Sequence, residues 1–469
     1  MPQSIPSSSL APVAVIGLGK IGLPLAVQYA LHGRQVIGCD INPRVIESVK
    51  AGISHVQGEP ELSQKLAEVV ASGHLDATCS TSEAVKQAGV VVVIVPVVVN
   101  EDHEVDFSSI DAATVAIGNG LRPGTLVIYE TTLPVGTTAG RFAHILSQQS
   151  GYQAGQDFQL AYSPERVSSG CIFRDLRIYP KVVGGIDEQS TAAVKAFYRS
   201  VLDDSTEILV MDSADDAELV KLIETTYRDV NIALANEYAR FADARGLNIN
   251  AAIVAANTQP YSHIHTPGVG VGGHCIPVYP YFLLAGAADL PSNAAFPQLT
   301  LPRLARRIND SMAEYAVQRI ENELGSLAGR SILILGVAYR GNIQEVAFTS
   351  AQLLQSALVA HGAEVYVDDP LFSAEELHAQ GYAHILIPED ENKVCAIILQ
   401  AAHQEYTTLA SELAHGRFAH CQVILDGRNA LPREAIEALG RRYIAIGDGQ
   451  PGTTERLRRE YEITSPLTS

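Results

Sequence analysis

The feature that most constrains the fold is a glycine turn between an apolar strand and a helix near the amino end. Residues 13–16 form an apolar strand-like run, and residues 23–31 continue at helical spacing. The turn glycines have GxGxxG spacing and are Gly17, Gly19 and Gly22. A second apolar run at 35–39 ends on Asp40, 18 residues after the last of these glycines. Strand, turn, helix, strand and terminal acid in this order predict a dinucleotide-binding βαβ unit.

The same residues indicate which dinucleotide binds. Glycines let backbone amides approach a pyrophosphate at a helix start, and Asp40 can accept hydrogen bonds from a ribose 2′-hydroxyl. Because a carboxylate repels a 2′-phosphate, the sequence predicts NAD rather than NADP. The alternative is that the glycines only permit a tight turn in a sheet that binds nothing. Arg44 either contacts the adenosine side or is a solvated helix residue, and the sequence leaves both open.

Charge and hydropathy exclude several classes of partner. The formal net charge is −19, so nucleic acid and anionic membrane surfaces are repelled on average. The longest aliphatic run, residues 90–99, is too short to span a bilayer. The first nine residues have neither the basic region nor the apolar core of a signal peptide. We therefore expect a soluble cytoplasmic protein with neither kind of partner.

The cysteines single out one position. The six cysteines, with no CxxC pair and no metal-ligand spacing, are Cys39, Cys79, Cys171, Cys275, Cys395 and Cys421. This pattern favours reduced thiols and no metal site, and five of the six are predicted to be small core residues. Cys275 differs because it follows the glycine-dense run Gly268-Val-Gly-Val-Gly-Gly-His. A thiol on so flexible a loop, in a chain that binds nicotinamide, predicts oxidation through a covalent thiohemiacetal.

The remaining periodicities predict an α/β protein with two Rossmann-like, doubly wound parallel-sheet domains joined by a central helical domain with a long helix. Further strands are expected at 90–95, 125–130, 329–336, 363–368, 395–399 and 422–425, and long helices at 214–245 and 301–325. The predicted boundaries are a tail at 1–11, an NAD-binding domain at 12–212, a helical domain at 213–326, a second Rossmann-like domain at 327–448 and a tail at 449–469.

Six ordered motifs resemble those of the nucleotide-sugar 6-dehydrogenase family, which includes UDP-glucose, GDP-mannose and UDP-N-acetylhexosamine dehydrogenases. They are GLGKIGLPLA, TTLPVGT, YSPERV, AELVKLIETTYRDVNIALANE, GVGVGGHCIP and GVAYRGN, and they run from about residue 12 to residue 448. The YSPERV form resembles the N-acetylhexosamine branch. The resemblance implies a four-electron oxidation of a primary alcohol to a carboxylate with two NAD⁺. It also implies a nucleotide-sugar site in the C-terminal domain and a homodimer or higher homo-oligomer through the central helix.

The resemblance also assigns roles to individual residues. Cys275 captures the aldehyde and carries the thioester, while Lys221 stabilises the oxyanion. Glu165 orients a substrate hydroxyl or moves protons with water, and Thr132 holds the hydrolytic water or a cofactor edge. The structural alternatives are a solvated helix lysine at 221 and a surface carboxylate at 165. The other substrate-binding residues implied are Gly272 and Arg340.

Five positions depart from the family pattern. Tyr279 stands where the family has an aspartate implicated in activating water, and Thr225 replaces an asparagine that shares the oxyanion role. The hydroxyl of Thr225 still donates one hydrogen bond. Ala347 and Tyr261 replace two arginines, and Val97 replaces a threonine. The departures indicate that this chain has diverged from the family in the hydrolysis of the thioester and in the identity of its substrate. The alternatives are therefore a non-standard substrate, arrest at the aldehyde or thioester, or a non-catalytic binding or scaffold protein.

Overall fold

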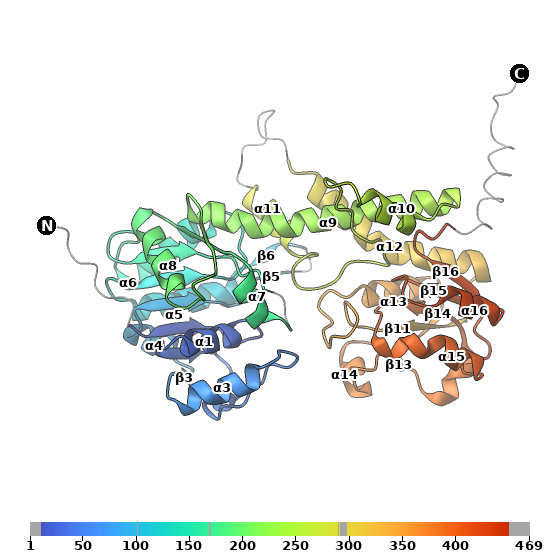
Figure 1. Cartoon of the computed structure of the whole chain (residues 1–469), viewed down its shortest axis with the longest axis horizontal. Coiled ribbons are helices and arrows are strands. Elements are labelled where there is room, and N and C mark those ends of the chain that lie inside the picture. Colours follow the sequence, from blue (N-terminus) through green and yellow to red (C-terminus); the bar gives the residue numbers. More distant parts are fainter. Residues whose placement is uncertain (1–10, 101, 168–169, 289, 291–297, 450–469) are drawn as a thin grey trace, which may run out of the picture. The chain divides into compact units, whose positions relative to one another are not determined.

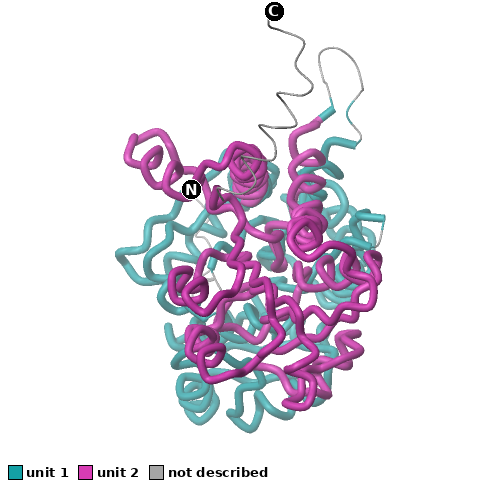
Figure 2. The backbone as a smooth tube through the Cα atoms, turned by 90° about the vertical axis from the view of Figure 1, so that its right-hand side faces the viewer, with its two compact units in different colours: residues 1–224, 281–298 teal, residues 225–280, 299–469 magenta. Residues whose placement is uncertain are grey.

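The computed structural model describes residues 11–100, 102–167, 170–288, 290 and 298–449. The chain divides into two compact units, Met1–Glu224 with Tyr281–Gln298, and Thr225–Pro280 with Leu299–Ser469 (Figure 2). The predicted tails lie outside the described residues except for Ala11 and Gly449. Among the helices of the described ranges, none is long and apolar enough to cross a membrane.

The first unit contains an eight-stranded sheet with the order β10-β9-β8-β7-β4-β1-β2-β3. Most of this unit is drawn in blue to green in Figure 1. Its strands are β1 (Val13–Ile16), β2 (Val36–Cys39), β3 (Leu75–Thr78), β4 (Val90–Val93), β7 (Leu126–Tyr129), β8 (Gln159–Tyr162), β9 (Lys181–Gly185) and β10 (Ile208–Val210). The predicted parallel sheet is confirmed from β3 to β8, whereas β9 pairs antiparallel to β8. A short antiparallel pair, β5 (Val98–Val99) and β6 (Val105–Asp106), lies apart from this sheet.

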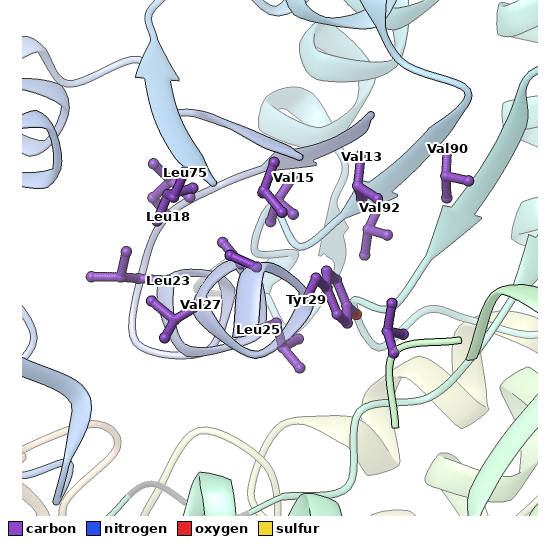
Figure 3. Packing of buried hydrophobic residues seen from close by; sticks show 14 of the residues in the cluster. Val13, Val15, Leu18, Leu23, Leu25, Val27, Tyr29, Leu75, Val90 and Val92 are labelled. Atoms are coloured by element: carbon purple, nitrogen blue, oxygen red, sulfur yellow. The ribbon is translucent and has the colours of Figure 1, made fainter. Parts of the chain in front are cut away.

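The strands of this sheet are apolar because helices cover both faces. All four valines of β4 are buried, as expected for a central parallel strand. One core cluster joins Val13 and Val15 of β1 to Leu23 and Val27 of the following helix (Figure 3). The helices are α1 (Gly22–Leu31), α2 (Pro43–Lys50), α3 (Leu62–Ala71), α4 (Thr81–Gln87), α5 (Ser108–Gly120), α6 (Ala143–Ser150), α7 (Ile172–Ile178) and α8 (Glu188–Arg199), with a π-helical turn η1 (Thr137–Phe142) before α6.

Strand order reverses on either side of β1, which pairs with β2 on one side and β4 on the other. In open α/β sheets, ligands bind in the crevice at the carboxyl ends of the two strands where the order reverses. The turn that starts at Gly17 leaves β1 at this edge. The fold therefore places the glycine turn where a dinucleotide is expected.

The long helix α9 (Ala214–Arg245) has its predicted bounds. Its buried residues include the polar Glu218, Lys221, Thr225, Asp229, Asn236 and Asp243 beside apolar ones such as Ala217, Leu222 and Ala239. Its exposed large apolar residues are Ile223, Tyr227, Leu234, Tyr238 and Phe241. The remaining central helices are α10 (Ile249–Ala256), α11 (Tyr279–Gly286) and α12 (Leu301–Leu324). The helix thus buries polar side chains together with small apolar ones and exposes several large apolar ones, which departs from a simple amphipathic surface helix.

The second unit contains a six-stranded parallel sheet with the order β13-β12-β11-β14-β15-β16. Its strands are β11 (Ser331–Leu335), β12 (Glu364–Asp368), β13 (His384–Ile385), β14 (Val394–Leu399), β15 (Val423–Asp426) and β16 (Arg442–Ala445). Its helices are α13 (Ser350–Ala360), α14 (Ala374–Ala379), α15 (Leu409–Ala414) and α16 (Arg433–Ala438), with 3-10 turns η2 (Pro388–Lys393) and η3 (Gln404–Thr408). Helices α12 and α13 share one core cluster with the sheet, and α15 and α16 share another.

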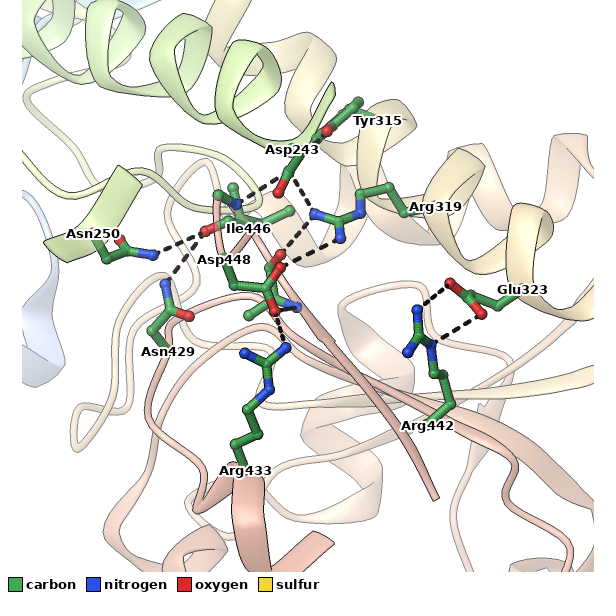
Figure 4. Close-up of polar contacts among 12 residues, drawn as sticks. Asp243, Asn250, Tyr315, Arg319, Glu323, Asn429, Arg433, Arg442, Ile446 and Asp448 are labelled. Carbon is green, nitrogen blue, oxygen red and sulfur yellow. Dashed lines mark hydrogen bonds and ion pairs between the residues drawn. The ribbon is translucent and has the colours of Figure 1, made fainter. Parts of the chain in front are cut away.

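Buried ion pairs fasten α9 and α12 to the end of β16 within the second unit (Figure 4). Arg319 of α12 donates to Asp243 of α9 at 2.5 Å and to the carbonyl of Ala445 at 2.6 Å. The backbone of Gly447 donates to the same Asp243 carboxylate at 3.1 Å. Breaking a buried ion pair of this kind strongly destabilises the fold, because it leaves a buried charge without a partner. These pairs therefore hold the carboxyl half of α9 in place.

Candidate functional site

The structure explains in different ways why glycine stands at each of the three fingerprint positions. Gly17 has φ +93°, a left-handed conformation that favours glycine, and an added Cβ lies 2.8 Å from the carbonyl oxygen of Ile94. At Gly22 a Cβ lies 1.8 Å from the carbonyl oxygen of Gly17. A Cβ at Gly19 meets no described atom within 4 Å. Chain packing therefore explains the outer two glycines, while Gly19 borders open space beside the helix start, where a pyrophosphate fits.

Asp40 is held over the glycine turn. Its Oδ2 accepts the backbone N–H of Leu18 at 3.0 Å, and its Oδ1 accepts that of Asn42 at 2.9 Å. Each carboxylate oxygen has a second lone pair, so both retain capacity for a ribose hydroxyl. Arg44 is exposed at the start of α2, and only its backbone N–H has a recorded contact, with Asn42 at 3.0 Å. Both interpretations of its side chain therefore remain predictions.

The end of β7 is fixed to α9 by a buried acid that sequence reasoning missed. Glu218 is fully buried and accepts N–H donors from Gly136 at 2.6 Å and Thr138 at 2.8 Å, as well as the Thr138 hydroxyl. Burial raises the pKa of Glu218 to about 7, against the effect of these donors. Thr132 is 6% exposed in the segment that Glu218 holds. The sequence signal that could have identified Glu218 is its place three residues before Lys221, on the same face of the helix.

Glu165 is not a surface carboxylate. Its side chain is 11% exposed, and its Oε2 lies 3.1 Å from Nζ of Lys181. Its Oε1 accepts the backbone N–H groups of Arg166 and Val167 at 2.6 and 2.9 Å. The Arg166 guanidinium pairs instead with Glu224 of α9 at 2.6 Å. Glu165 is therefore a buried, oriented acceptor.

Lys221 and Thr225 share the buried side of α9. Lys221 is 9% exposed and Thr225 is 4% exposed, so the interpretation of Lys221 as a solvated helix lysine is wrong. Residues four apart on a helix are neighbours, which sets the ammonium and the hydroxyl one turn apart on one face. Both side chains are thus potential donors on the same helix.

The glycines of the Cys275 loop allow close packing. An added Cβ at Gly272 lies 2.6 Å from Cβ of Tyr339, and one at Gly270 lies 2.6 Å from Cβ of Ser350. The backbone N–H of Gly273 donates to the carbonyl of Ala347 at 2.7 Å. These contacts explain the glycines by close approach of two backbones. The prediction from the sequence was that these glycines make the loop flexible, and it missed that close packing requires them.

A buried polar ladder holds the beginning of this loop. The N–H of Gly268 donates to Asn236 at 3.0 Å, and the Asn236 amide donates to Asn309 of α12 at 2.9 Å. Asn309 donates in turn to Asp229 at 2.8 Å, and Arg306 pairs with the same carboxylate at 2.5 Å. The ladder connects α9 and α12 to the loop within the second unit.

Cys275 is half-buried at the end of the loop. Its carbonyl accepts the N–H of Val278 at 3.2 Å and that of Tyr279 at 2.9 Å, so Tyr279 lies one turn beyond it. The neighbouring His274 is exposed, and its Nε2 lies 3.4 Å from a carboxylate oxygen of Glu345. The loop is therefore anchored on both sides of the thiol.

The prediction for the other five cysteines is wrong in part. Cys39, Cys395 and Cys421 are buried, but Cys79 is exposed and Cys171 is half-buried. Both of the misplaced residues lie close to element ends, where a small side chain does not imply burial.

The cations of the second unit differ from expectation. Arg340 is exposed and lies with its guanidinium 5.9 Å from the ring centre of Tyr339. Arg428, which sequence reasoning missed, is half-buried, and its Nε donates to the carbonyl of Gln400 at 2.6 Å. Its Nη2 has no hydrogen-bond partner among the described residues, and an added Cβ at Gly268 lies 3.1 Å from its Nη1. Burial lowers the pKa of Arg428 to about 10. The signal was a lone arginine after the acidic end of β15.

The departures from the family pattern fall in different environments. Tyr261 is 89% exposed, whereas Val97 is 8% exposed. Ala347 uses its backbone carbonyl to hold Gly273. The predicted residues thus fall into two sets. The first unit holds Gly17, Gly19, Gly22, Asp40, Arg44, Thr132, Glu165 and Lys221, and the second unit holds Thr225, Gly272, Cys275 and Arg340.

Three family models match the chain in series. They are the NAD binding domain, central domain and UDP binding domain of the UDP-glucose/GDP-mannose dehydrogenase family, at residues 11–202, 215–311 and 333–433. The first match contains the glycine turn and Asp40, the second contains Lys221 and Cys275, and the third contains Arg340 and Arg428.

Named relatives agree with this assignment. The chain is 35% identical to a UDP-N-acetyl-D-mannosamine dehydrogenase of Pyrococcus horikoshii, over 90% of this chain and 97% of the relative. A solved structure of UDP-D-ManNAc dehydrogenase from P. horikoshii matches with a TM-score of 0.82 and 33% identity, covering 93% of this chain and 99% of that one. A structure of an NDP-N-acetyl-D-galactosaminuronic acid dehydrogenase from Methanosarcina mazei also gives a TM-score of 0.82, at 29% identity, covering 95% and 96%. The chain thus belongs to the UDP-glucose/GDP-mannose dehydrogenase family and is an NAD-dependent nucleotide-sugar dehydrogenase.

Proposed function

We propose that the chain oxidises the primary 6-hydroxyl of a UDP-N-acetylhexosamine to the uronic acid through Cys275, with two NAD⁺ reduced per turnover. The observation that carries the proposal is the half-buried Cys275 on a glycine loop that is packed against the segment containing Tyr339 and Ala347. That segment belongs to the part matched by the UDP binding domain model. The nucleophile and the nucleotide-binding segment are thus coupled within one unit.

Two NAD⁺, which the glycine turn and Asp40 would hold in succession, would each supply the acceptor for one hydride. The substrate alcohol loses a proton and a hydride to give the aldehyde, and the Cys275 thiolate adds to its carbonyl carbon to form a thiohemiacetal. Loss of a second hydride and proton gives a thioester. Water then adds to the thioester carbonyl, and the C–S bond breaks to release the carboxylate and regenerate the thiol. Cysteine permits the second oxidation without prior hydration of the aldehyde.

The buried donors of α9 suit the charge that develops on the substrate oxygen. The Lys221 ammonium and the Thr225 hydroxyl are fixed one turn apart, so they need no reorganisation to stabilise an alkoxide or oxyanion. Glu165 accepts a hydrogen bond from the substrate hydroxyl or from water. Tyr279, in place of an acid, has no carboxylate to activate the hydrolytic water, and release of the product is the step that we expect to be slow.

The sugar is tested by a panel of UDP-N-acetylmannosamine, UDP-N-acetylgalactosamine, UDP-N-acetylglucosamine, UDP-glucose and GDP-mannose. The P. horikoshii relative is named as a UDP-N-acetyl-D-mannosamine dehydrogenase, so we place UDP-N-acetylmannosamine first. NADH absorbance gives the stoichiometry: two per sugar support full oxidation, and one supports arrest at the aldehyde or thioester. No NADH with any sugar supports a non-standard substrate or a non-catalytic protein and contradicts the proposal.

Arg428, whose Nη2 is buried, provides a cation for the diphosphate in this proposal. Replacement by glutamine is expected to raise the KM for the UDP-sugar by about 10- to 100-fold, the effect of one charge-assisted hydrogen bond, with kcat little changed. Arg340→Gln is the matched comparison, and a smaller rise is expected because Arg340 is exposed. Steady-state kinetics and calorimetry with UDP measure both. Equal effects of the two replacements would contradict the assignment to Arg428.

We propose a second copy of this chain as the partner of α9. Four exposed apolar residues form a stripe at helical spacing: Tyr227, Leu234, Tyr238 and Phe241. Phe241→Asp is expected to convert a dimer of two 50.2 kDa chains into monomers, measured by light scattering after size exclusion. Val359→Asp, at an exposed apolar position of α13, is the control and should leave the mass unchanged. A dimer that survives Phe241→Asp would exclude this stripe as the interface.

A further inference from the structure

A buried lysine lies between two carboxylates in the first unit. Nζ of Lys181, at the start of β9, is 2.9 Å from Oε2 of Glu130 and 3.1 Å from Oε2 of Glu165. The side chains of the three residues are 7%, 0% and 11% exposed, respectively. Nothing in the proposed chemistry uses Lys181, yet desolvating an ammonium is expensive unless it is paired.

The hydrogen bonds to Glu130 explain why it is an anchor. Its Oε1 accepts the phenol hydroxyls of Tyr29 and Tyr198, and its Oε2 accepts Lys181. These donors favour the anion of Glu130, whereas burial and the neighbouring Glu165 carboxylate raise its pKa. The Lys181 ammonium also lies 4.7 Å from the ring centre of Tyr198. Glu130 and Tyr198 thus hold Lys181 on the side away from Glu165.

Glu165 is fixed from the opposite side. Two backbone N–H groups hold its Oε1, and Lys181 holds its Oε2. The cavity beside it, lined by Glu165, Arg166 and Lys181 among others, has a volume of about 10 Å³, room for at most one water. The carboxylate is therefore oriented by Lys181 on one oxygen and by the two backbone N–H groups on the other.

We propose that Lys181 is a positioning residue of the dehydrogenase reaction, which acts through Glu165 by holding its carboxylate oriented and ionised. The inference rests on the proposed function, because it assumes that Glu165 accepts a hydrogen bond or proton from the substrate or water. Burial raises the pKa of Glu165, but the Lys181 charge and the Val167 N–H outweigh it and hold the pKa below its usual value. Glu165 is then an acceptor at neutral pH despite being buried.

A double-mutant cycle with Lys181→Met and Glu165→Gln tests the coupling. Glu165→Gln is expected to lower kcat by about 10²-fold, the effect of removing a proton acceptor, and Lys181→Met by a comparable factor. If Lys181 acts only through Glu165, the double variant is no slower than the slower single variant. KM for NAD is expected to stay unchanged in all three variants.

Two control variants separate positioning from a general effect of removing charge. Glu130→Gln breaks the other ion pair of the same lysine but keeps the Lys181–Glu165 contact, so a loss of kcat clearly smaller than that of Lys181→Met is expected. Lys195→Met removes an exposed lysine of α8 and should change nothing. A purely structural Lys181 would make Glu130→Gln as harmful to kcat as Lys181→Met.

The pH profile of kcat gives a second readout that a purely structural role does not move. With Lys181 removed, burial is no longer offset, so the acidic limb in Lys181→Met is expected to move to higher pH by about one unit or more. If this variant does not fold, Glu130→Gln combined with Lys181→Met removes one charge of each sign. The combined variant is expected to show the same loss of kcat and the same shift.

The outcomes distinguish the inference from the function on which it rests. A wild-type chain that reduces no NAD with any sugar of the panel overturns the proposed function, and the role of Lys181 with it. An active wild-type chain in which the two losses multiply in the double variant, or in which the acidic limb does not move, overturns only the role of Lys181. If the losses of kcat in the double variant do not multiply and the acidic limb of the pH profile moves, the result supports both the proposed function and the role of Lys181.

Discussion

Serine in place of Cys275 is expected to abolish formation of the carboxylate. A serine hydroxyl is almost entirely protonated at neutral pH, so the variant has no thiolate to capture the aldehyde. At most one NADH per sugar should form, against two for the wild-type chain. Stoichiometry by NADH absorbance and identification of the released sugar by mass spectrometry measure the effect.

Cys79→Ser is the matched control because Cys79 is the exposed cysteine of the first unit. It should retain full oxidation, which shows that loss of a thiol is not harmful in itself. Undiminished uronic acid from Cys275→Ser would sink the covalent mechanism. In the wild-type chain, denaturation during turnover should trap the sugar as an acyl group on Cys275, and a large trapped fraction is expected because Tyr279 supplies no acid for hydrolysis.

Alanine at Gly22 is expected to destroy NAD binding and to lower the melting temperature. The new methyl group lies 1.8 Å from the carbonyl oxygen of Gly17, and neither backbone segment can move without displacing α1 or β1. A strained or displaced turn misplaces the amides that face the pyrophosphate. Thermal unfolding and calorimetric titration with NAD measure the two effects separately.

Gly19→Ala, in the same turn, is expected to affect NAD binding but not thermal stability. No described atom lies within 4 Å of its added Cβ, so the melting temperature should stay near that of the wild-type chain. NAD affinity should still fall, because the methyl group occupies the open side where the pyrophosphate approaches. Gly140→Ala, also without a described atom within 4 Å, should alter neither property. Unchanged NAD affinity in Gly19→Ala would show that the dinucleotide does not approach this turn.

The sequence predicted most elements whose pattern is local. The glycine turn, the valine strand and the full length of α9 follow from spacing over a few residues, and all are present. The reversed direction of β9 did not follow, because strand direction depends on partners distant in the chain. Lys181 was missed as a buried charge for the same reason: its two partners are 51 and 16 residues away.

The buried side of α9 could not be read from periodicity. A helical repeat shows that apolar residues share a face but not whether that face is covered by the same chain. In α9 the covered face holds Glu218, Lys221 and Asp229, and Glu218 and Asp229 have partners on other elements. Lys221 and Thr225, which have roles in the proposed reaction, are polar residues that are buried, although polar residues of a helix are usually exposed. Only the three-dimensional packing identifies them as buried.

The close packing of the Cys275 loop has a consequence for engineering. Residues 268–275 fit against residues 339–350 at contacts too tight for any side chain at Gly270 or Gly272. A chimera that imports the nucleotide-binding domain of a relative from residue 327 onward would join a foreign surface to the native loop. Exchanging residues 268–275 together with that domain keeps the pair matched. The nucleophile and the specificity of the enzyme are thus expected to be inherited as one module, although more than 60 residues separate them in the chain.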